Sequence, residues 1–271
     1  FVARRNLKSS IPIQILMKKI LFAILFATVS ASVSFAQEHH CFTTEMDNIA
    51  TANDPDMLRK RQELESFIQR YATVERRNSG VVYVIPIVFH ILHNYGGENI
   101  SDAQILDQVR ILNRDFRKLN ADTINIVPAF QGRAADCEIE FRLPSIDPNG
   151  NCTNGIDRIQ TMLTYSANDQ SKLNPWPNDK YFNVWVAHSL ENTGAAAYAY
   201  YPGASNAIDG VLCLYTYIGS IGASNENKSR VLTHEIGHSF NLAHVWGSTN
   251  SPGVACGDDN VSDTPETKGW T

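Results

Sequence analysis

Three histidines and a glutamate near the end of the sequence have the types and spacing of a metal site. They lie in the stretch His234-Glu235-Ile236-Gly237-His238-Ser239-Phe240-Asn241-Leu242-Ala243-His244. Residues four apart share one side of a helix, so His234 and His238 can direct two imidazoles at one point. Glu235 can reach a water molecule at that point without being a ligand itself. The pattern predicts a metal-binding helix with a general base.

The third histidine requires this helix to end early. His244 lies six residues after His238, and a straight helix would carry it to a different side. Asparagine tolerates the left-handed backbone that ends helices, so we expect the chain to reverse at Asn241 after Phe240. Three neutral imidazoles with an open fourth position are typical of a single catalytic zinc ion.

Such a site predicts peptide-bond hydrolysis. Zinc lowers the pKa of its bound water to about 7, Glu235 can accept that proton, and the same carboxyl can pass it to the leaving amine. The alternative is a helix whose histidines lie at the surface or in the core and bind no metal.

Composition excludes some classes of protein. The chain has 271 residues, 43% of them hydrophobic, which is enough for a core without disulfides. Its net charge of −5 and the absence of a basic cluster argue against nucleic acid binding. The cysteines are odd in number and widely spaced, so at least one lacks a partner; they are Cys41, Cys137, Cys152, Cys213 and Cys256.

The N-terminal region carries a predicted export signal. Residues 1–16 precede Met17 and lack an initiating methionine, so we interpret them as sequence translated upstream of the true start. Residues 17–36 combine a basic start, a short apolar run and small residues before a cut after Ala36, as in a signal peptide. The run is shorter than the roughly 20 residues of a membrane span, so we expect a secreted protein without a stable span.

Residues 37–79 have the pattern of a pro-segment. Asp54 and Pro55 are a helix start, followed by apolar residues at helical spacing that need another surface to cover them. The dibasic pair Arg76-Arg77 suits proteolytic nicking. We therefore expect a second domain at 80–271.

That second domain has the pattern of a mixed sheet with two long helices, an α+β or α/β arrangement. A β-branched run at 81–90 predicts a strand covered on both faces. Ser101, in a capping box with Gln104, predicts a helix to about Asn120, and the metal-binding helix should begin between Ser224 and Ser229. Further strands are expected at 138–143, 155–161, 181–187 and 210–217.

The stretch from His234 to Trp246 resembles the zinc signature of metzincin metallopeptidases. It is most similar to the pappalysin family, in which Asn often replaces the Gly of the turn. A second block, from Cys256 to Pro265, resembles that family's G-D-x-V-x-D-T-P element. With weaker likenesses upstream, the resemblance covers about Val81 to the C-terminus.

This resemblance implies an α+β fold of the metzincin upper-subdomain type: a twisted mixed sheet, an active-site helix and a backing helix, preceded by a short helical pro-segment. It implies a secreted zinc endopeptidase made as a zymogen, acting on protein or peptide substrates, and we expect a monomer. Residues 195–201 are the candidate edge that pairs with substrate by strand addition, unless they form an ordinary tyrosine-rich loop.

The resemblance also suggests a calcium ion at Asp259 and Asp263, whose hard oxygens suit it. The alternative is a pair of turn aspartates that accept backbone hydrogen bonds. Cys41 resembles a cysteine switch, in which a thiolate occupies the open zinc position until the pro-segment is removed. A free or disulfide-bonded Cys41 is the alternative.

Metzincins carry a methionine-containing turn beneath the zinc, but Met162 is the last methionine here. We therefore expect a fragment that lacks the lower subdomain, this turn and a disulfide partner for Cys256. A second hypothesis is a secreted adhesion or interaction module that binds metal without turnover. A binding module would not need a general base, so Glu235 favours the enzyme.

Overall fold

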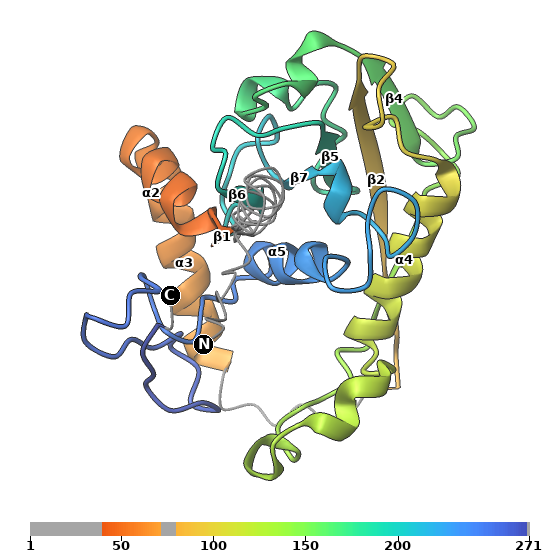
Figure 1. The fold of residues 1–271 in the computed structure, drawn as a ribbon. Coiled ribbons are helices and arrows are strands. Elements are labelled where there is room, and N and C mark those ends of the chain that lie inside the picture. The colour runs from red at the N-terminus through yellow and green to blue at the C-terminus, as the bar shows by residue number, and fades with distance from the viewer. Residues whose placement is uncertain (1–39, 72–79, 270–271) are drawn as a thin grey trace, which may run out of the picture. The chain divides into compact units, whose positions relative to one another are not determined.

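The computed structural model describes residues 40–71 and 80–269, all within a compact unit formed by residues 39–271 (Figure 1). The expected upstream segment at 1–16, the signal peptide at 17–36 and the Arg76-Arg77 pair lie outside the described residues. No helix in the described ranges is both long and apolar enough to cross a membrane.

A mixed seven-stranded sheet forms the centre of the described residues, in the order β1-β6-β7-β5-β2-β3 with β4 also beside β2. The strands are β1 His40–Cys41, β2 Tyr83–His93, β3 Ile139–Arg142, β4 Ile156–Gln160, β5 Phe182–Ala187, β6 Ala195–Tyr198 and β7 Val211–Leu214. Only the β6–β7 pair is antiparallel. The predicted mixed sheet is confirmed.

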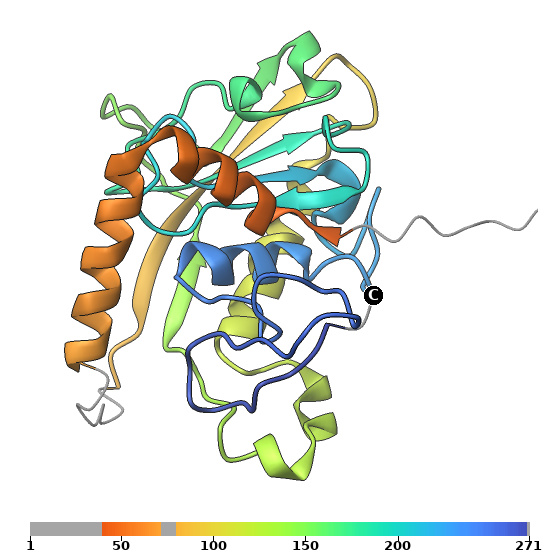
Figure 2. The same cartoon turned by 90° about the vertical axis from the view of Figure 1, so that its left-hand side faces the viewer.

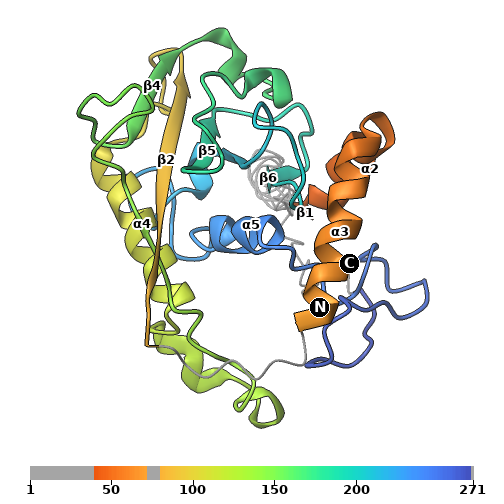
Figure 3. The same ribbon diagram turned by 180° about the vertical axis from the view of Figure 1, so that it is seen from behind.

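Strand β2 is the long central strand that the β-branched run predicted, shifted by a few residues. Its second half, from Ile87 to His93, is buried because β5 and β4 flank it and other elements cover both faces. Its first half is exposed, with Tyr83 at 62%, and pairs only with β3. Figure 3 shows β2 running alongside the backing helix α4.

Helices α4 (Asp102–Phe116) and α5 (Val231–Ser239) lie on one side of the sheet (Figure 2). Ser101 caps α4 by accepting a hydrogen bond from Gln104 N–H, as predicted. The Gln104 side chain does not return to Ser101; it is buried and donates to Ile218 O at 2.8 Å. The capping box is therefore wrong, because a tertiary partner takes the amide.

Helix α4 also ends earlier than the expected Asn120. Lys118 adopts a positive φ of 52°, and Leu119 N–H donates back to Arg114 O at 2.7 Å. Leu119 consequently points to solvent with 73% exposure instead of extending the apolar face of α4. The metal-binding helix α5 begins at Val231, slightly after the predicted range.

The N-terminal region forms two helices, α2 (Thr43–Asn53) and α3 (Pro55–Tyr71), where one was predicted. They lie at the β1–β6 end of the sheet, and α4 lies at the β2 end (Figures 1 and 3). Arg61 of α3 makes a two-pronged ion pair with the buried Asp47 of α2, both bonds at 2.5 Å. Of the predicted apolar stripe on α3, only Met57 is buried.

Short 3₁₀ segments complete the described elements. They are η1 Ala121–Asn125, η2 Pro128–Phe130, η3 Met162–Thr164, η4 Asp169–Ser171 and η5 Tyr215–Tyr217. The last of these replaces the end of the strand expected at 210–217, because β7 stops at Leu214.

Candidate metal centre

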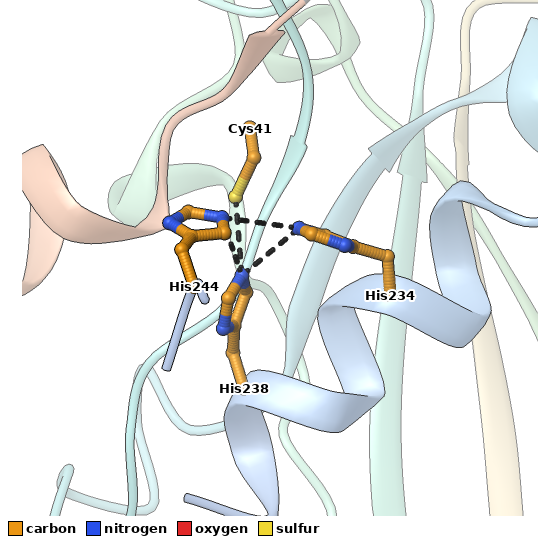
Figure 4. A group of neighbouring side chains, drawn as sticks. All are labelled: Cys41, His234, His238 and His244. Atoms are coloured by element: carbon orange, nitrogen blue, oxygen red, sulfur yellow. Dashed lines mark hydrogen bonds between the residues drawn. The ribbon is translucent and has the colours of Figure 1, made fainter. Parts of the chain in front are cut away.

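Four side chains from two distant parts of the chain converge at one point (Figure 4). They are Cys41, His234, His238 and His244, and their ligand atoms all lie within 4.8 Å of one another. The three histidine Nε2 atoms are 3.0, 3.2 and 3.3 Å apart, and Cys41 Sγ lies 3.3 Å from His238 Nε2. Lone pairs that meet this closely repel one another unless a cation lies between them.

The turn at Asn241 brings His244 back to the helix. Asn241 has a φ of 69°, in the left-handed region. Asn241 N–H donates to His238 O at 2.9 Å, and Leu242 N–H donates to Gly237 O at 3.0 Å. These two bonds form a Schellman motif, in which the left-handed residue directly follows the C-cap Phe240.

Hydrogen bonding sets the tautomer of His238. Its Nδ1 lies 2.7 Å from Leu242 O, and only a protonated Nδ1 can donate to that carbonyl. Nε2 therefore presents a lone pair to the cluster. The His244 ring stacks on Trp246 at a centroid distance of 4.7 Å, which orients the third imidazole.

The surroundings keep the imidazoles neutral, the form that binds metals. Burial, followed by the neighbouring His238, lowers the pKa of His244 to about 4. Burial also lowers the pKa of His238. Burial and the other two imidazoles lower the pKa of His234, although His234 is partly exposed to solvent.

The spacing fits zinc. Two imidazole nitrogens about 2.0–2.1 Å from a tetrahedral ion lie about 3.3–3.4 Å apart, close to the separations found here. Imidazole nitrogen and thiolate sulfur are the ligand atoms that zinc prefers. The four residues could therefore hold one tetrahedral ion.

Cys41 reaches the cluster because its strand joins the sheet. β1 pairs in parallel with β6, with Cys41 opposite Ala197. Residues 195–201 thus contain strand β6, and β1 of the N-terminal segment occupies the edge position beside it. Burial, and next the charge of Glu235, raise the pKa of the Cys41 thiol, and both effects would be opposed by a bound cation.

Glu235 lies beside the cluster and is 1% exposed. Its Oε2 accepts a hydrogen bond from Thr43 Oγ1 at 2.8 Å and lies 3.8 Å from Cys41 Sγ. Burial raises the pKa of Glu235 to about 7, although the bonds from Thr43 and Cys41 oppose that rise. A carboxyl with this pKa can both accept and release a proton near neutral pH.

Thr43 is a site residue that the sequence did not reveal, and Tyr201 was predicted only as the last residue of the candidate edge at 195–201. Thr43 is completely buried and also accepts a hydrogen bond from Ala199 N–H at 2.9 Å. The centroid of the Tyr201 ring lies 5.4 Å from that of the His238 ring. The guanidinium carbon of Arg61 lies over the Tyr201 ring, 5.2 Å from its centroid. No spacing pattern links residues so far apart in the chain.

The other predicted ligands do not join a cluster. In the described part of the chain, Asp259 and Asp263 belong to no group of three or more metal-binding side chains. Asp259 Oδ1 accepts from Val261 N–H at 3.0 Å, which is the turn arrangement given as the alternative. All five cysteines are free.

Comparisons with known proteins agree with this fold. Residues 165–271 match the model of the peptidase family described as pregnancy-associated plasma protein-A. The chain belongs to this family, the pappalysins, which are metzincin metallopeptidases. The family implies a catalytic metal.

Solved structures of mirolysin from Tannerella forsythia are similar. Mature mirolysin in complex with a cleaved peptide is 37% identical, with a TM-score of 0.65 over 70% of this chain and 74% of that one. A promirolysin mutant is 32% identical, with a TM-score of 0.71 over 86% of this chain and 76% of that one.

Two curated relatives bear the name extracellular metalloprotease. The protein from Colletotrichum graminicola is 25% identical over 72% of this chain and 61% of its own length. The one from Verticillium alfalfae is 26% identical over 67% of this chain and 58% of its own length. The chain thus spans about 60% of the length of these relatives.

Proposed function

We propose that this chain is part of a secreted zinc-dependent endopeptidase made as a zymogen. The observation that carries the proposal is the convergence of three neutral imidazoles beside the buried carboxyl of Glu235. His234, His238 and His244 would hold the ion. Zinc bound there would supply Lewis acidity to the attacking water and to the substrate carbonyl.

Glu235 moves the proton. Its Oε2 accepts a proton from the attacking water and then delivers it to the leaving nitrogen of the peptide bond, so the carboxyl ends each cycle unchanged. The pKa of about 7 that burial produces suits both transfers near neutral pH. The edge of β6 that β1 now occupies would, once the N-terminal segment has left, bind the peptide by strand addition.

Residues 37–79 would act as the pro-segment and 80–271 as the catalytic domain. In the latent protein, β1 occupies the edge of β6, Thr43 binds Glu235 and Cys41 supplies the fourth ligand. Removal of the segment, by cleavage near Arg76-Arg77, would expose all three. Export through the signal peptide at 17–36 belongs to the same proposal.

A calcium ion at Asp259 and Asp263 is a separate and weaker proposal, because Asp259 already accepts a backbone hydrogen bond. Calcium titration of the complete protein, followed by thermal unfolding, tests it. A midpoint that rises in wild type and not in an Asp259→Asn variant supports the ion, and equal curves dismiss it.

The test of the peptidase uses the complete protein without its pro-segment and a denatured protein substrate. Chelation of zinc should abolish cleavage, and added zinc should restore it. Glu235→Gln should retain zinc and lose about 10²–10⁴-fold in kcat. Zinc retained with no cleavage by the wild type would instead support the alternative, a secreted metal-binding interaction module.

The cysteine switch has its own test. Cobalt in place of zinc in the intact chain should show a thiolate-to-cobalt charge-transfer band that Cys41→Ser lacks. A band of equal strength in both proteins would rule out the thiolate as a ligand.

A further inference from the structure

A buried lysine lies behind the edge strand, outside the metal centre. Lys172 is 4% exposed, and its Nζ lies 3.2 Å from Asp169 Oδ1 and donates to Ile208 O at 2.6 Å. The ammonium also lies 4.6–5.6 Å from the centroids of three aromatic rings, those of Trp185, Tyr198 and Tyr200. Cation–π contacts of this kind are favourable when the cation is desolvated.

Asp169 connects Lys172 to the edge strand. Its two oxygens accept hydrogen bonds from Tyr198 OH at 3.0 Å and Tyr200 OH at 2.6 Å. Asp169 itself lies in η4, whose first turn is fixed by a capping box between Asn168 and Ser171. A rigid turn therefore holds both tyrosines through one carboxylate.

The two tyrosines flank the backbone amide that faces the site. In an extended chain, side chains two apart lie on the same side, so Tyr198 and Tyr200 both turn toward Asp169. Ala199, between them, donates its N–H to Thr43 Oγ1, which binds Glu235. Asp169 and Lys172 thus set, through Tyr198 and Tyr200, the position of the edge backbone relative to Glu235.

The edge needs this support once the N-terminal segment has left. β6 pairs with β7 over a short register, at Ala197 and Tyr198, and its other side pairs with the two-residue strand β1. Without β1, only β7 would hold it by backbone bonds. Lys172 is buried and the Asp169 side chain is 29% exposed. Desolvation of the ammonium offsets most of the attraction in such an ion pair, so a positional role explains the pair better than stability alone does.

We propose that Asp169 and Lys172 are positioning residues that hold residues 198–200 where an extended peptide substrate can pair with the edge beside Glu235. The inference rests on the proposed function. It adds the residues that orient the peptide-binding edge, through hydrogen bonds to Tyr198 and Tyr200.

The test uses Tyr198→Phe/Tyr200→Phe in the complete protein. This change keeps both rings over Lys172 and removes only the hydroxyl bonds to Asp169. Tyr181→Phe is the matched control, since Tyr181 OH donates to Ile146 O at 3.0 Å away from the edge. The measurements are KM and kcat on a long peptide, zinc content, and hydrogen exchange of the amides at 197–200.

The double variant should raise KM about three- to tenfold and change kcat less than about twofold, because edge contacts hold ground state and transition state alike. Exchange at 197–200 should accelerate about fivefold or more relative to the rest of the sheet. Zinc content should not change, and Tyr181→Phe should behave as wild type.

Lys172→Met separates positioning from stability. Removing one partner of an ion pair lowers stability because it leaves the other charge uncompensated, but Asp169 keeps its two tyrosine hydroxyl donors and is 29% exposed. A purely structural role predicts wild-type KM in the fraction of the variant that is folded, whereas positioning predicts a raised KM in that fraction. If Lys172→Met does not fold, KM and hydrogen exchange of the Tyr198→Phe/Tyr200→Phe variant decide between the two roles.

Unchanged KM and unchanged exchange in the double variant of an active enzyme would overturn the inference and leave the peptidase intact. A wild type that shows no chelator-sensitive cleavage would overturn both. Equal changes in the Tyr181→Phe control would also overturn it, because the effect would then be a general loss of a tyrosine hydrogen bond.

Discussion

The hydroxyl of Thr43 donates a hydrogen bond to Glu235 Oε2 across 2.8 Å, between residues 192 positions apart in the chain. Thr43 Oγ1 also accepts a hydrogen bond from Ala199 N–H at 2.9 Å. The buried Thr43 side chain thus joins the N-terminal helix α2, the backbone that follows β6 and the helix that carries the histidines. Any group that approached Glu235 from the β6 edge would have to displace the Thr43 side chain.

Thr43→Val should weaken the hold of the N-terminal segment. The change removes the Thr43 donor from Glu235 and the hydroxyl acceptor from Ala199 N–H, at a cost of about 1–3 kcal/mol in the unfolding free energy of the intact chain. Urea unfolding measures this, and peptide cleavage should begin sooner in the variant. Thr51→Val, which removes a hydroxyl bonded to Asp47 O in the same helix, is the control and should not hasten cleavage.

Asn241 should tolerate glycine but not alanine. Its φ of 69° is strained for a residue with a Cβ atom, and Asn241→Ala should cost about 1 kcal/mol of unfolding free energy. Glycine adopts this conformation freely, so Asn241→Gly should match or exceed wild type. Urea midpoints and zinc affinity of both variants check the prediction, and equal losses in the two would contradict it.

His244→Ala should empty the metal centre. Wild type should bind about one zinc per chain after dialysis, and the variant much less, because only His234, His238 and Cys41 remain of the four ligands. His188→Ala is the control, since His188 is exposed and stacks on Tyr215 away from the cluster. Elemental analysis of both proteins gives the answer; full zinc content in His244→Ala would remove His244 from the ligand set.

Asp107 should make stability fall in acid. Burial alone would raise the pKa of Asp107, but bonds from Ser220 N–H, Arg110 and the Ser220 hydroxyl outweigh it and the net pKa is lowered. A lowered folded pKa means that the contribution is present above the unfolded value of about 3.9 and is lost as the pH falls through the folded value.

Asp107→Asn should therefore reduce the unfolding free energy by about 1–2 kcal/mol at pH 7 and by less at pH 2. Urea unfolding at several pH values measures the difference between the two proteins. A constant difference over this range would show that the Asp107 charge is not involved.

Local signals in the sequence determined the metal-binding helix and its end. The spacing of His234 and His238, and the asparagine at position 241, act over one or two helical turns, where backbone geometry leaves few choices. The buried run of β2 was readable for the same reason, because β-branched residues covered on both faces need no distant partner to be recognised. The end of α4 was not readable, because a left-handed Lys118 carries no such signal.

Only the tertiary structure decided which distant groups meet. Lysine is a residue type that usually lies at the surface. Lys172 is nevertheless buried, because Asp169, three aromatic rings and the Ile208 carbonyl surround it. Thr43 and Cys41 reach Glu235 and His238 only after β1 joins β6. Such contacts join residues far apart in the chain, and they form only when the packing of distant elements closes the long loop between them. No local pattern in the intervening sequence predicts which residues will meet.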